Sequence, residues 1–567
     1  MQMYVFQNDF TPDAYLQSDS NLAKRFATQL NAACEGFAGT PIPKLLPEDF
    51  ALFEQTGDRH KYEEKYFARR KRLVAFLLRA WLYGKADDIT ELIKILEAVT
   101  EEGTWALPAH VLGVSKEERR YAIDLFAAET AHTLCEALSL CGHLLPSALQ
   151  ERCVQEVFSR VIEPFESKRF SWEHEHSNWS AVCGGAVGMA AVYLIEDETR
   201  LAAITKRATE SCNAFIESCG DDGTCLEGLL YWAYAMQYYI GFDELYFQRT
   251  GKTIVRDNKK LARLSRLPYA CCIGGGLSVK FGDYDAPSFS FGILCKLSDR
   301  YGVPIPKEEY YIDLFDACGR TCGAVRNLAW FNGALLNGDT DREDEFFPRG
   351  QWAIRHEKNT VLAVKGGHNA EPHNHNDVGT FMFVCGGTVA LDDLECPLYE
   401  KNYFSDKRYD YINASSLGHS LPVVNGCAQC AGEKYAASEF TKEGKTVRVS
   451  FANAYEKAAG LRSLVRTLTL AEGLRVEDTF AFSGQENEVT ERVVTECTPV
   501  QTDEHAITLY ANDAPVAVVS FCGKGTLECR KNSFLRHDGV GARVFYQIDY
   551  TVRFSREGSL AYTVKPV

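Results

Sequence analysis

Two histidines separated by a single residue, His373 and His375, stand in the polar segment 371–379. On an extended segment, side chains two positions apart project to the same face. Asp392 and His419, arriving from neighbouring strands, could add a carboxylate and a third imidazole, and such nitrogen and oxygen ligands suit zinc. His375, Asp392 and His419 would therefore make a plausible zinc set. The alternative is that these groups are hydrogen-bonded at the end of a strand, because dispersed histidines and aspartates are a weak motif.

Asn178 directly precedes a run of small and apolar residues that is typical of a buried helix. An asparagine in this place is first of all a helix N-cap, and a second role, binding a ligand, stays open. Gly184, Gly185 and Gly188 lie further along the run, and each glycine costs a helix about 1 kcal/mol relative to alanine. We therefore expect another helix or a ligand to approach closely there.

Tyr231 and Tyr234 lie one helical turn apart, near the start of an aromatic-rich helix that follows the turn 221–223. The positive end of the helix dipole favours a phenolate or a bound anion in this place. Either tyrosine is therefore a candidate for a stabilised phenolate or for binding an anion. Tyr238 and Tyr239, further along, are predicted to belong to the core.

Two kinds of domain are expected to position these groups. From about residue 58 to about residue 300, apolar residues recur every three or four positions, as in Leu73, Phe76 and Leu77. Helical hairpins in series can close into a ring. After about residue 332 the period changes to two, as expected for antiparallel strands. We predict an α+β chain, with an (α/α) toroid at 1–331 and an antiparallel β-sandwich at 332–567.

The composition excludes some classes of protein. The chain has 567 residues, of which 46% are hydrophobic and 24% charged, and it lacks the run of about 18 apolar residues that would span a membrane. A net charge of -16 argues against nucleic acid as a partner, because neutralising phosphates requires clustered lysines and arginines. An anionic sugar needs only a local basic cleft, for which Arg349, Lys365 and Arg408 are candidates.

The 20 cysteines are scattered and form no paired CxxC motifs, so we expect reduced thiols rather than a disulfide scaffold. Near the amino terminus, Asn8 and Asp9 interrupt the apolar stretch that a secretory signal would need. These features predict a soluble, cytoplasmic protein. The sequence makes no prediction of the oligomeric state.

Taken together, these motifs resemble the heparinase II/III-like polysaccharide lyases, especially the branch that includes oligo-alginate lyases. The matching stretches follow one another in the same order over some 250 residues. They are residues 178–183, 227–228, 231–234, 373–379, 403–405, 408–409, 415–422 and 425–426, with Gln429. The rest of the chain agrees with the family only in pattern, as a toroid followed by a sandwich.

The resemblance implies a role for each matching residue. Asn178 and His373 would bind and neutralise the carboxylate of a uronate, and Tyr231 would transfer the proton. His375, Asp392 and His419 match the metal-binding positions of the family, where the metal is structural. No organic cofactor is implied. This chain carries Ser177 where some members place a histidine next to the asparagine. The residues expected to contribute to substrate binding are His176, Glu227, Tyr234, Arg349 and Arg408.

The implied reaction is β-elimination. Removing the proton from C5 of a uronate builds negative charge on a carboxylate that is already charged, and hydrogen bonds from Asn178 and His373 would stabilise it. Tyr231 would serve as base and then as acid towards O4 of the leaving sugar. If the two events occur on opposite faces, a histidine would be the base and Tyr231 only the acid. The product would be a 4,5-unsaturated uronate.

Two other functions stay open from the sequence. A glycoside hydrolase on an α/α toroid would use Asp221, Asp222 or Glu227 as acid and base, although the first two look more like a turn. A non-catalytic carbohydrate-binding protein would need none of the proposed catalytic set. For the lyase, we expect an anionic oligosaccharide as substrate, a glycosaminoglycan fragment first and alginate next.

Overall fold

The computed structural model describes residues 10–286, 289–337 and 342–567. The chain divides into two compact units that interleave along the sequence. Unit 1 comprises Met1–Cys219, Tyr231–Arg266 and Ser288–Gly338, and unit 2 comprises Gly220–Leu230, Leu267–Pro287 and Asp339–Val567. The expected single boundary at residue 331 therefore does not describe the division. Two short segments before it belong to unit 2, where Phe281 packs on Trp352 with ring centroids 5.2 Å apart.

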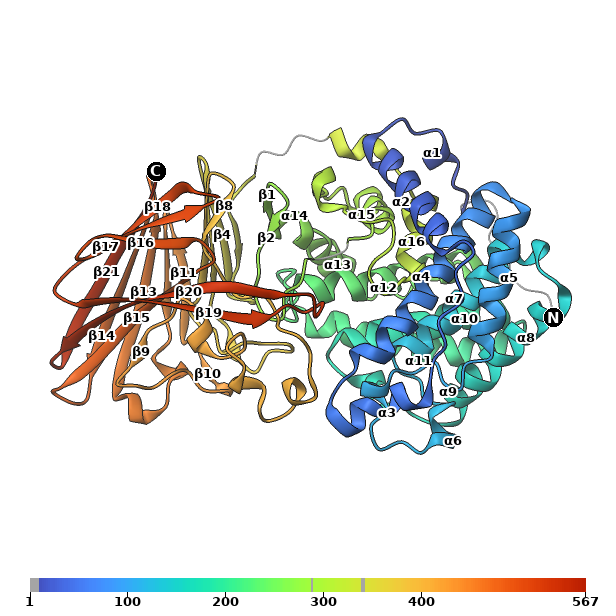
Figure 1. The fold of residues 1–567 in the computed structure, drawn as a ribbon, viewed down its shortest axis with the longest axis horizontal. Coiled ribbons are helices and arrows are strands. Elements are labelled where there is room, and N and C mark those ends of the chain that lie inside the picture. The colour runs from blue at the N-terminus through green and yellow to red at the C-terminus, as the bar shows by residue number, and fades with distance from the viewer. Residues whose placement is uncertain (1–9, 287–288, 338–341) are drawn as a thin grey trace. The chain divides into compact units, whose positions relative to one another are not determined.

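Unit 1 is built from helices (Figure 1). The α-helices that lie wholly or mostly in it are α1 (Asp13–Leu16), α2 (Asn21–Phe37), α3 (Pro47–Thr56), α4 (His60–Tyr83), α5 (Ala86–Thr100), α6 (Lys116–Arg119), α7 (Leu125–Cys141), α8 (Ser147–Val157), α9 (Glu163–Ser167), α10 (Asn178–Leu194), α11 (Glu198–Ser218), α12 (Leu229–Thr250), α13 (Asn258–Ser265), α15 (Phe291–Tyr301) and α16 (Thr321–Ala329).

Local signals set several helix ends. The side chain of Asp124 caps α7 by accepting a hydrogen bond from the backbone N–H of Ala127 at 2.8 Å. Asp197 caps α11 in the same way. At the C-terminal end of helix α4, the cap residue Gly84 adopts a left-handed conformation with φ of 60°. These are the residue types that satisfy the backbone groups left unpaired at helix ends.

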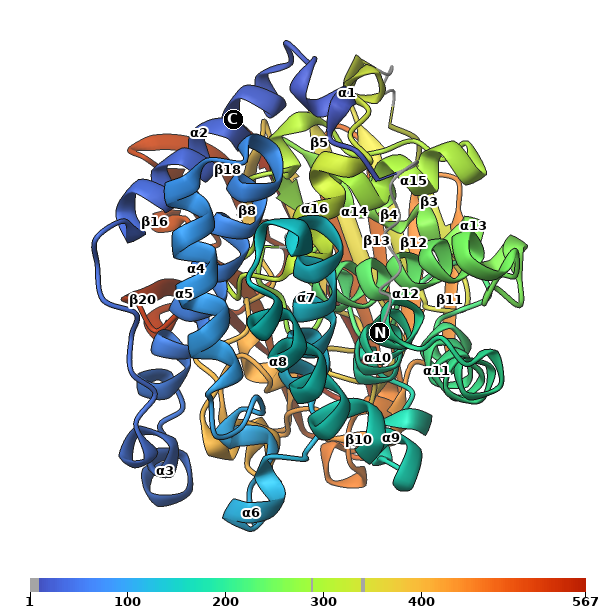
Figure 2. The same ribbon diagram turned by 90° about the vertical axis from the view of Figure 1, so that its right-hand side faces the viewer.

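The helices of unit 1 close into a ring. Helix α4 packs on α7, and α7 packs on α10. Helix α10 meets α12 at Gly185, and α12 meets α16 where Gly241 faces Cys322. Helix α16 returns to α4 and α7. Partners in helical hairpins lie beside these helices, with α5 on α4, α8 on α7 and α11 on α10 (Figure 2). Unit 1 is therefore the predicted toroid.

Unit 2 is built from antiparallel strands, with the short helix α14 (Leu267–Cys271). Its sheets have the orders β11-β12-β13-β14-β21-β18-β17-β16, β19-β20-β15-β9, β3-β4-β5-β7-β8, β10-β6 and β1-β2. The strands are β1 (Cys272–Gly274), β2 (Leu277–Ser278), β3 (Glu345–Phe347), β4 (Trp352–Glu357), β5 (Thr360–Lys365), β6 (His368–Asn369), β7 (Phe381–Cys385), β8 (Thr388–Leu391), β9 (Val423–Val424), β10 (Gly432–Ala436), β11 (Glu439–Glu443), β12 (Thr446–Ser450), β13 (Leu461–Leu470), β14 (Leu474–Phe482), β15 (Asn487–Thr495), β16 (Thr498–Asp503), β17 (Ala506–Ala511), β18 (Ala514–Phe521), β19 (Thr526–Leu535), β20 (Ala542–Phe554) and β21 (Glu557–Pro566).

The three larger sheets share one hydrophobic core. Leu362 of β5, Leu468 of β13 and Ile548 of β20 all belong to a single cluster of buried side chains. The pairing of strands places buried side chains opposite one another, since Leu468 on β13 lies opposite Val476 on β14. A strand buries every second side chain, so the period of two in the sequence places these residues on the inner faces. The predicted antiparallel β-sandwich is therefore confirmed.

The structure also bears on two expectations from the sequence, which concern membrane-spanning segments and the cysteines. Within the described ranges, every helix is too short or too polar to cross a lipid bilayer. All 20 cysteines of the sequence lie in the described part of the chain, where they are free thiols and most are buried. They pack as small apolar side chains.

Candidate functional site

Helices α10 and α12 of unit 1 pack closely and run in the same direction. A Cβ atom on Gly185 would lie 2.6 Å from the backbone oxygen of Tyr238, and one on Gly188 would lie 2.5 Å from the ring of Phe242. The contacts advance together along both helices, so the helices are parallel. The close approach expected at these glycines is thus made by another helix.

This packing fixes the relation between Asn178 and Tyr231. Asn178 is the first residue of α10, seven positions before Gly185. Tyr231 lies seven positions before Tyr238, in the first turn of α12. Seven residues make almost two full turns, or about 10 Å of helix. Asn178 and Tyr231 therefore stand at the same level on facing sides of two parallel helices, and both are buried, with exposed fractions of 1% and 9%.

Asn178 does not occupy the N-cap position that its sequence context suggested. The N-cap of α10 is Ser177, whose side chain makes no capping hydrogen bond. His176, which we expected to help bind substrate, is exposed, and its Nδ1 atom lies 3.2 Å from the backbone oxygen of Ala214.

The second tyrosine of α12 is committed to partners inside unit 1. The hydroxyl of Tyr234 donates a hydrogen bond to Glu129, and the guanidinium of Arg320 lies 3.8 Å from the centre of the Tyr234 ring. Burial raises the pKa of the Tyr234 phenol well above its usual value. Burial also raises the pKa of Glu129 to about 7, although Arg320 acts to lower it. Tyr234 is thus held as a protonated donor.

In unit 2, His373 has a strained backbone and a fixed ring. Its φ of 55° is in the left-handed region, which costs a residue other than glycine on the order of 1–3 kcal/mol. Its Nδ1 atom donates a hydrogen bond to Asp283 at 2.9 Å, and its Nε2 atom lies 3.5 Å from a carboxylate oxygen of Glu227. Phe404, which is 54% exposed, packs edge-on against the ring.

Asp283, which the sequence analysis did not single out, joins several of the predicted residues. The same carboxylate accepts hydrogen bonds from His373, His375, Arg408 and the hydroxyl of Tyr403. Burial acts to raise its pKa, yet these donors, with Arg408 the strongest, hold the pKa well below the usual value. Asp283 precedes His373 by 90 residues, and no local pattern in the sequence signals this partnership.

Buried ion pairs hold the loop that carries the histidines. Lys365 binds Asp377 at 2.6 Å and Glu371 at 3.2 Å. Arg466 of β13 donates a hydrogen bond to the backbone oxygen of Gly379 at 3.0 Å. The charge of Lys365, a candidate for the basic cleft, is therefore neutralised inside the sandwich.

The two arginines expected to bind substrate are placed differently. Arg408 is mostly buried and bound to Asp283 at 2.8 Å. Arg349 is exposed, and its backbone N–H donates to Asp222 at 2.6 Å. The carboxylate of Asp222 also accepts from the backbone N–H of Gly350 and the hydroxyl of Thr224. Asp222 thus acts as a turn residue, as its sequence context suggested.

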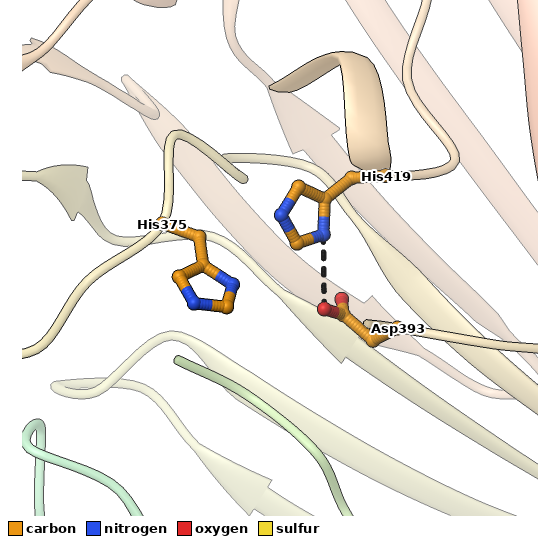
Figure 3. A group of neighbouring side chains, drawn as sticks. All are labelled: His375, Asp393 and His419. Atoms are coloured by element: carbon orange, nitrogen blue, oxygen red, sulfur yellow. Dashed lines mark ion pairs between the residues drawn. The ribbon is translucent and has the colours of Figure 1, made fainter. Parts of the chain in front are cut away.

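Three side chains of unit 2 converge as a candidate metal centre (Figure 3). His375 lies in the loop after β6, Asp393 follows β8, and His419 follows a short 3-10 helix at Ser416–Gly418. One ligand atom from each lies within 4.8 Å of the others, and all three side chains are buried. Nothing in the sequence spacing requires this, since the three segments are brought together only by the sandwich.

The predicted carboxylate ligand is off by one residue. Asp392 accepts a hydrogen bond from Lys280 at 3.1 Å, whereas Asp393 places an oxygen 2.9 Å from Nδ1 of His419. Consecutive side chains at the end of a strand point to opposite sides. Asp392 therefore faces Lys280, and Asp393 takes its place beside the imidazoles.

The hydrogen bonds of the two imidazoles suit a metal ion. Nε2 of His375 is bonded to Asp283, and Nε2 of His419 is bonded to the backbone oxygen of Asn413. If each Nε2 carries the proton, both Nδ1 atoms present lone pairs, and in the described part of the chain Nδ1 of His375 has no hydrogen-bond partner. Nδ1 of His419 and Oδ1 of Asp393 lie 2.9 Å apart, so either a proton on the ring or a bound cation must stand between these two atoms. Acceptors held by such outer bonds are typical of zinc sites.

The comparisons with known proteins concern the whole fold. No known family model and no curated protein sequence matches the chain. A crystal structure of heparinase III matches with a TM-score of 0.62 and 12% identity, over 100% of this chain and 93% of that one. Heparan sulfate lyase HepC from Pedobacter heparinus matches with a TM-score of 0.57 and 13% identity, over 97% and 84%.

A third structure extends the likeness. The chondroitin AC lyase of Streptomyces coelicolor A3, in complex with chondroitin sulphate, matches with a TM-score of 0.54 and 10% identity, over 97% of this chain and 80% of that one. At these identities a likeness establishes the fold. The chain has the fold of the heparinase-like polysaccharide lyases, a helical toroid with a β-sandwich.

Proposed function

We propose that this chain is a polysaccharide or oligosaccharide lyase that cleaves a uronic-acid-containing glycan by β-elimination. The fold it shares with heparan sulfate and chondroitin lyases supports the class of reaction. The observation that carries the proposal is the placement of Asn178 and Tyr231 at one level on two parallel helices. An amide donor and a phenol held in this way suit a substrate that has a carboxylate beside an acidic C–H bond. A glycosaminoglycan fragment is the preferred substrate, and alginate is next.

In the proposed reaction, the C5 proton is removed and the C4–O4 bond breaks. The electron pair of the C–H bond becomes the new double bond between C4 and C5, and O4 leaves with a proton. Tyr231 delivers that proton, because Tyr234 is bound to Glu129 and has a raised pKa. Tyr231 either takes the C5 proton itself and passes it to O4, or serves only as the acid while a histidine takes the C5 proton.

Asn178 and His373 stabilise the charge that grows on the uronate carboxylate. Asp283 keeps the Nδ1 proton of His373 in place, so a ligand would meet the Nε2 edge of the ring, which lies 3.5 Å from Glu227. Hydrogen bonds of this kind act on charge that develops only in the transition state, and each contributes about 3–4 kcal/mol in comparable sites. Arg349 is the exposed cation that would attract an anionic sugar.

We further propose that zinc binds His375, Asp393 and His419. A bound ion would tie together three segments of the sandwich, a structural role that leaves the elimination to the other residues. His375 is two positions from His373, so the same loop would carry a metal ligand and a catalytic group.

The test is the ultraviolet absorbance of the conjugated product. Purified protein is incubated separately with heparan sulfate, chondroitin sulfate, hyaluronan and alginate oligosaccharides, beside a Tyr231→Phe control. A rise in absorbance with one substrate, lost in the control, supports the proposal and identifies the substrate class. New reducing ends without absorbance would mean hydrolysis and would overturn it. A substrate that binds without either change would indicate a carbohydrate-binding protein.

A further inference from the structure

The carboxylate of Asp283 lies between two histidines of different proposed roles. Its Oδ2 atom accepts a hydrogen bond from Nδ1 of His373 at 2.9 Å. Its Oδ1 atom accepts one from Nε2 of His375 at 3.1 Å. The Asp283 side chain is fully buried. One rigid group therefore connects the histidine proposed for catalysis to a histidine proposed as a metal ligand.

Other donors clamp this carboxylate in place. Arg408 donates to Oδ1 at 2.8 Å, and the hydroxyl of Tyr403 donates to the same atom. The guanidinium of Arg408 also stacks 4.2 Å from the centre of the Tyr403 ring. With four donors on two oxygens, the carboxylate has little freedom to rotate. A displacement of one imidazole is therefore passed to the other.

The backbone reinforces the same connection. The N–H of Asp283 donates a hydrogen bond to the backbone oxygen of His373 at 2.9 Å. Gly282, with φ of +73°, permits this approach, because a Cβ atom there would lie 3.0 Å from that oxygen. His373 itself has a left-handed backbone. The segment around Asp283 thus holds both the main chain and the side chain of His373.

We infer that Asp283 is a positioning residue that couples occupancy of the metal site to the orientation of His373. The inference rests on the proposed function for the role of His373. A metal ion held by His375, Asp393 and His419 would fix the ring of His375. Its Nε2–H then fixes Asp283, which holds the ring of His373 with Nε2 presented. Partners that orient metal ligands in this way change affinity or activity by about 10–100-fold when they are removed.

The first test measures metal binding without any substrate. Metal-stripped wild type, Asp283→Asn and Asp283→Ala are titrated with Co²⁺ alone, and the visible absorption of the ion reports binding. We expect the dissociation constant to rise by about 10–100-fold in both variants. The control is Asp549→Asn, which alters another buried carboxylate, bound to Arg492 at 2.8 Å and, among the residues that the structure describes, hydrogen-bonded to no histidine. Unchanged affinity in the Asp283 variants would overturn the inference.

The second test measures the coupling itself. Diethylpyrocarbonate modifies accessible imidazole nitrogens, and mass spectrometry of the peptide containing His373 gives the rate for that residue. In the wild type we expect Zn²⁺ to change this rate several-fold. In Asp283→Asn the rate should be the same with and without Zn²⁺. A zinc effect of equal size in the variant, or none in the wild type, would contradict the coupling.

Kinetics separate this inference from the proposed function. On a cleaved substrate, Asp283→Asn should lower kcat about 10–100-fold with a smaller change in KM, because a misplaced His373 affects the transition state more than binding. If the wild type cleaves no uronan, the proposed function fails, and the two metal experiments still decide the coupling. If the wild type is active and Asp283→Asn keeps its kcat, the inference fails and the function stands.

Discussion

The carboxylate of Asp393 lies beside His419, with Oδ1 2.9 Å from Nδ1. Its neighbour Asp392 points the other way and binds Lys280. The two aspartates are adjacent in sequence and both buried, so they form a matched pair for testing the metal site.

Asp393→Asn should weaken zinc binding by at least about 10-fold, since it removes the one anionic ligand of the cluster. Asp392→Asn should leave zinc affinity unchanged, because Lys280 retains Glu395 at 3.4 Å. Competition between the metal-stripped protein and a coloured chelator measures both affinities. Equal loss in the two variants would mean that the effect comes from disturbing the strand rather than from losing a ligand.

The sequence predicts the architecture well because its signals are local. Helical and strand periods follow from which side chains face a core, and the change of period near residue 332 falls between the end of α16 at Ala329 and the start of β3 at Glu345. The interleaved division could not be predicted in this way. The segments 220–230 and 267–287 are short, and their packing on unit 2 depends on contacts with residues much later in the chain.

The sequence names residues of the candidate site where a motif marks them, and it cannot name the residues that only the fold brings together. His375 and His419 do meet. The choice between Asp392 and Asp393 depends on the exact end of β8, and a shift of one residue reverses the side on which a side chain lies. Asp283 carries no motif at all. The charge of Arg408, which is expected to bind substrate, is balanced by Asp283, and no spacing could reveal this ion pair.

Tyr231→Phe should abolish cleavage almost completely, with a loss of about 10²–10⁴-fold in kcat, because the variant cannot transfer a proton. Tyr234 lies one helical turn after Tyr231, and Tyr234→Phe removes the hydroxyl that donates a hydrogen bond to the buried Glu129. We expect it to lower the free energy of unfolding by about 1–3 kcal/mol and to keep most of the activity. Steady-state kinetics and urea denaturation of both variants check this. A reversed pattern would assign the proton transfer to Tyr234.

Gly185→Ala should disturb the pairing of α10 and α12. The new Cβ atom would lie 2.6 Å from the backbone oxygen of Tyr238, which cannot move aside as a side chain would. We expect a loss of about 1–3 kcal/mol in the free energy of unfolding. We also expect kcat to fall, because this contact holds Asn178 and Tyr231 at the same height along the two helices.

Gly36→Ala in helix α2 provides the control for that experiment. Apart from its chain neighbours and the backbone of its own helix, no described atom lies within 4 Å of a Cβ atom built at Gly36, so the substitution removes the helix cost of glycine without a clash. The free energy of unfolding should rise by about 0.5–1 kcal/mol, with kcat unchanged. If Gly185→Ala behaved like Gly36→Ala, the close packing of α10 on α12 would be wrong.

Glu129→Gln should change how stability depends on pH. Burial raises the pKa of Glu129 from 4.5 to about 7, so between these values the folded chain holds a proton that the unfolded chain has lost. The stabilising contribution is complete below pH 4.5 and is lost as the pH rises towards about 7. Over this range the wild type should lose on the order of 2–3 kcal/mol in its free energy of unfolding relative to the variant.

Arg320 keeps Asp316 as a partner at 2.6 Å, so Glu129→Gln leaves no unpaired cation. Urea denaturation of both proteins at one-unit pH intervals measures the difference, and parallel pH profiles would show that Glu129 is ionised throughout.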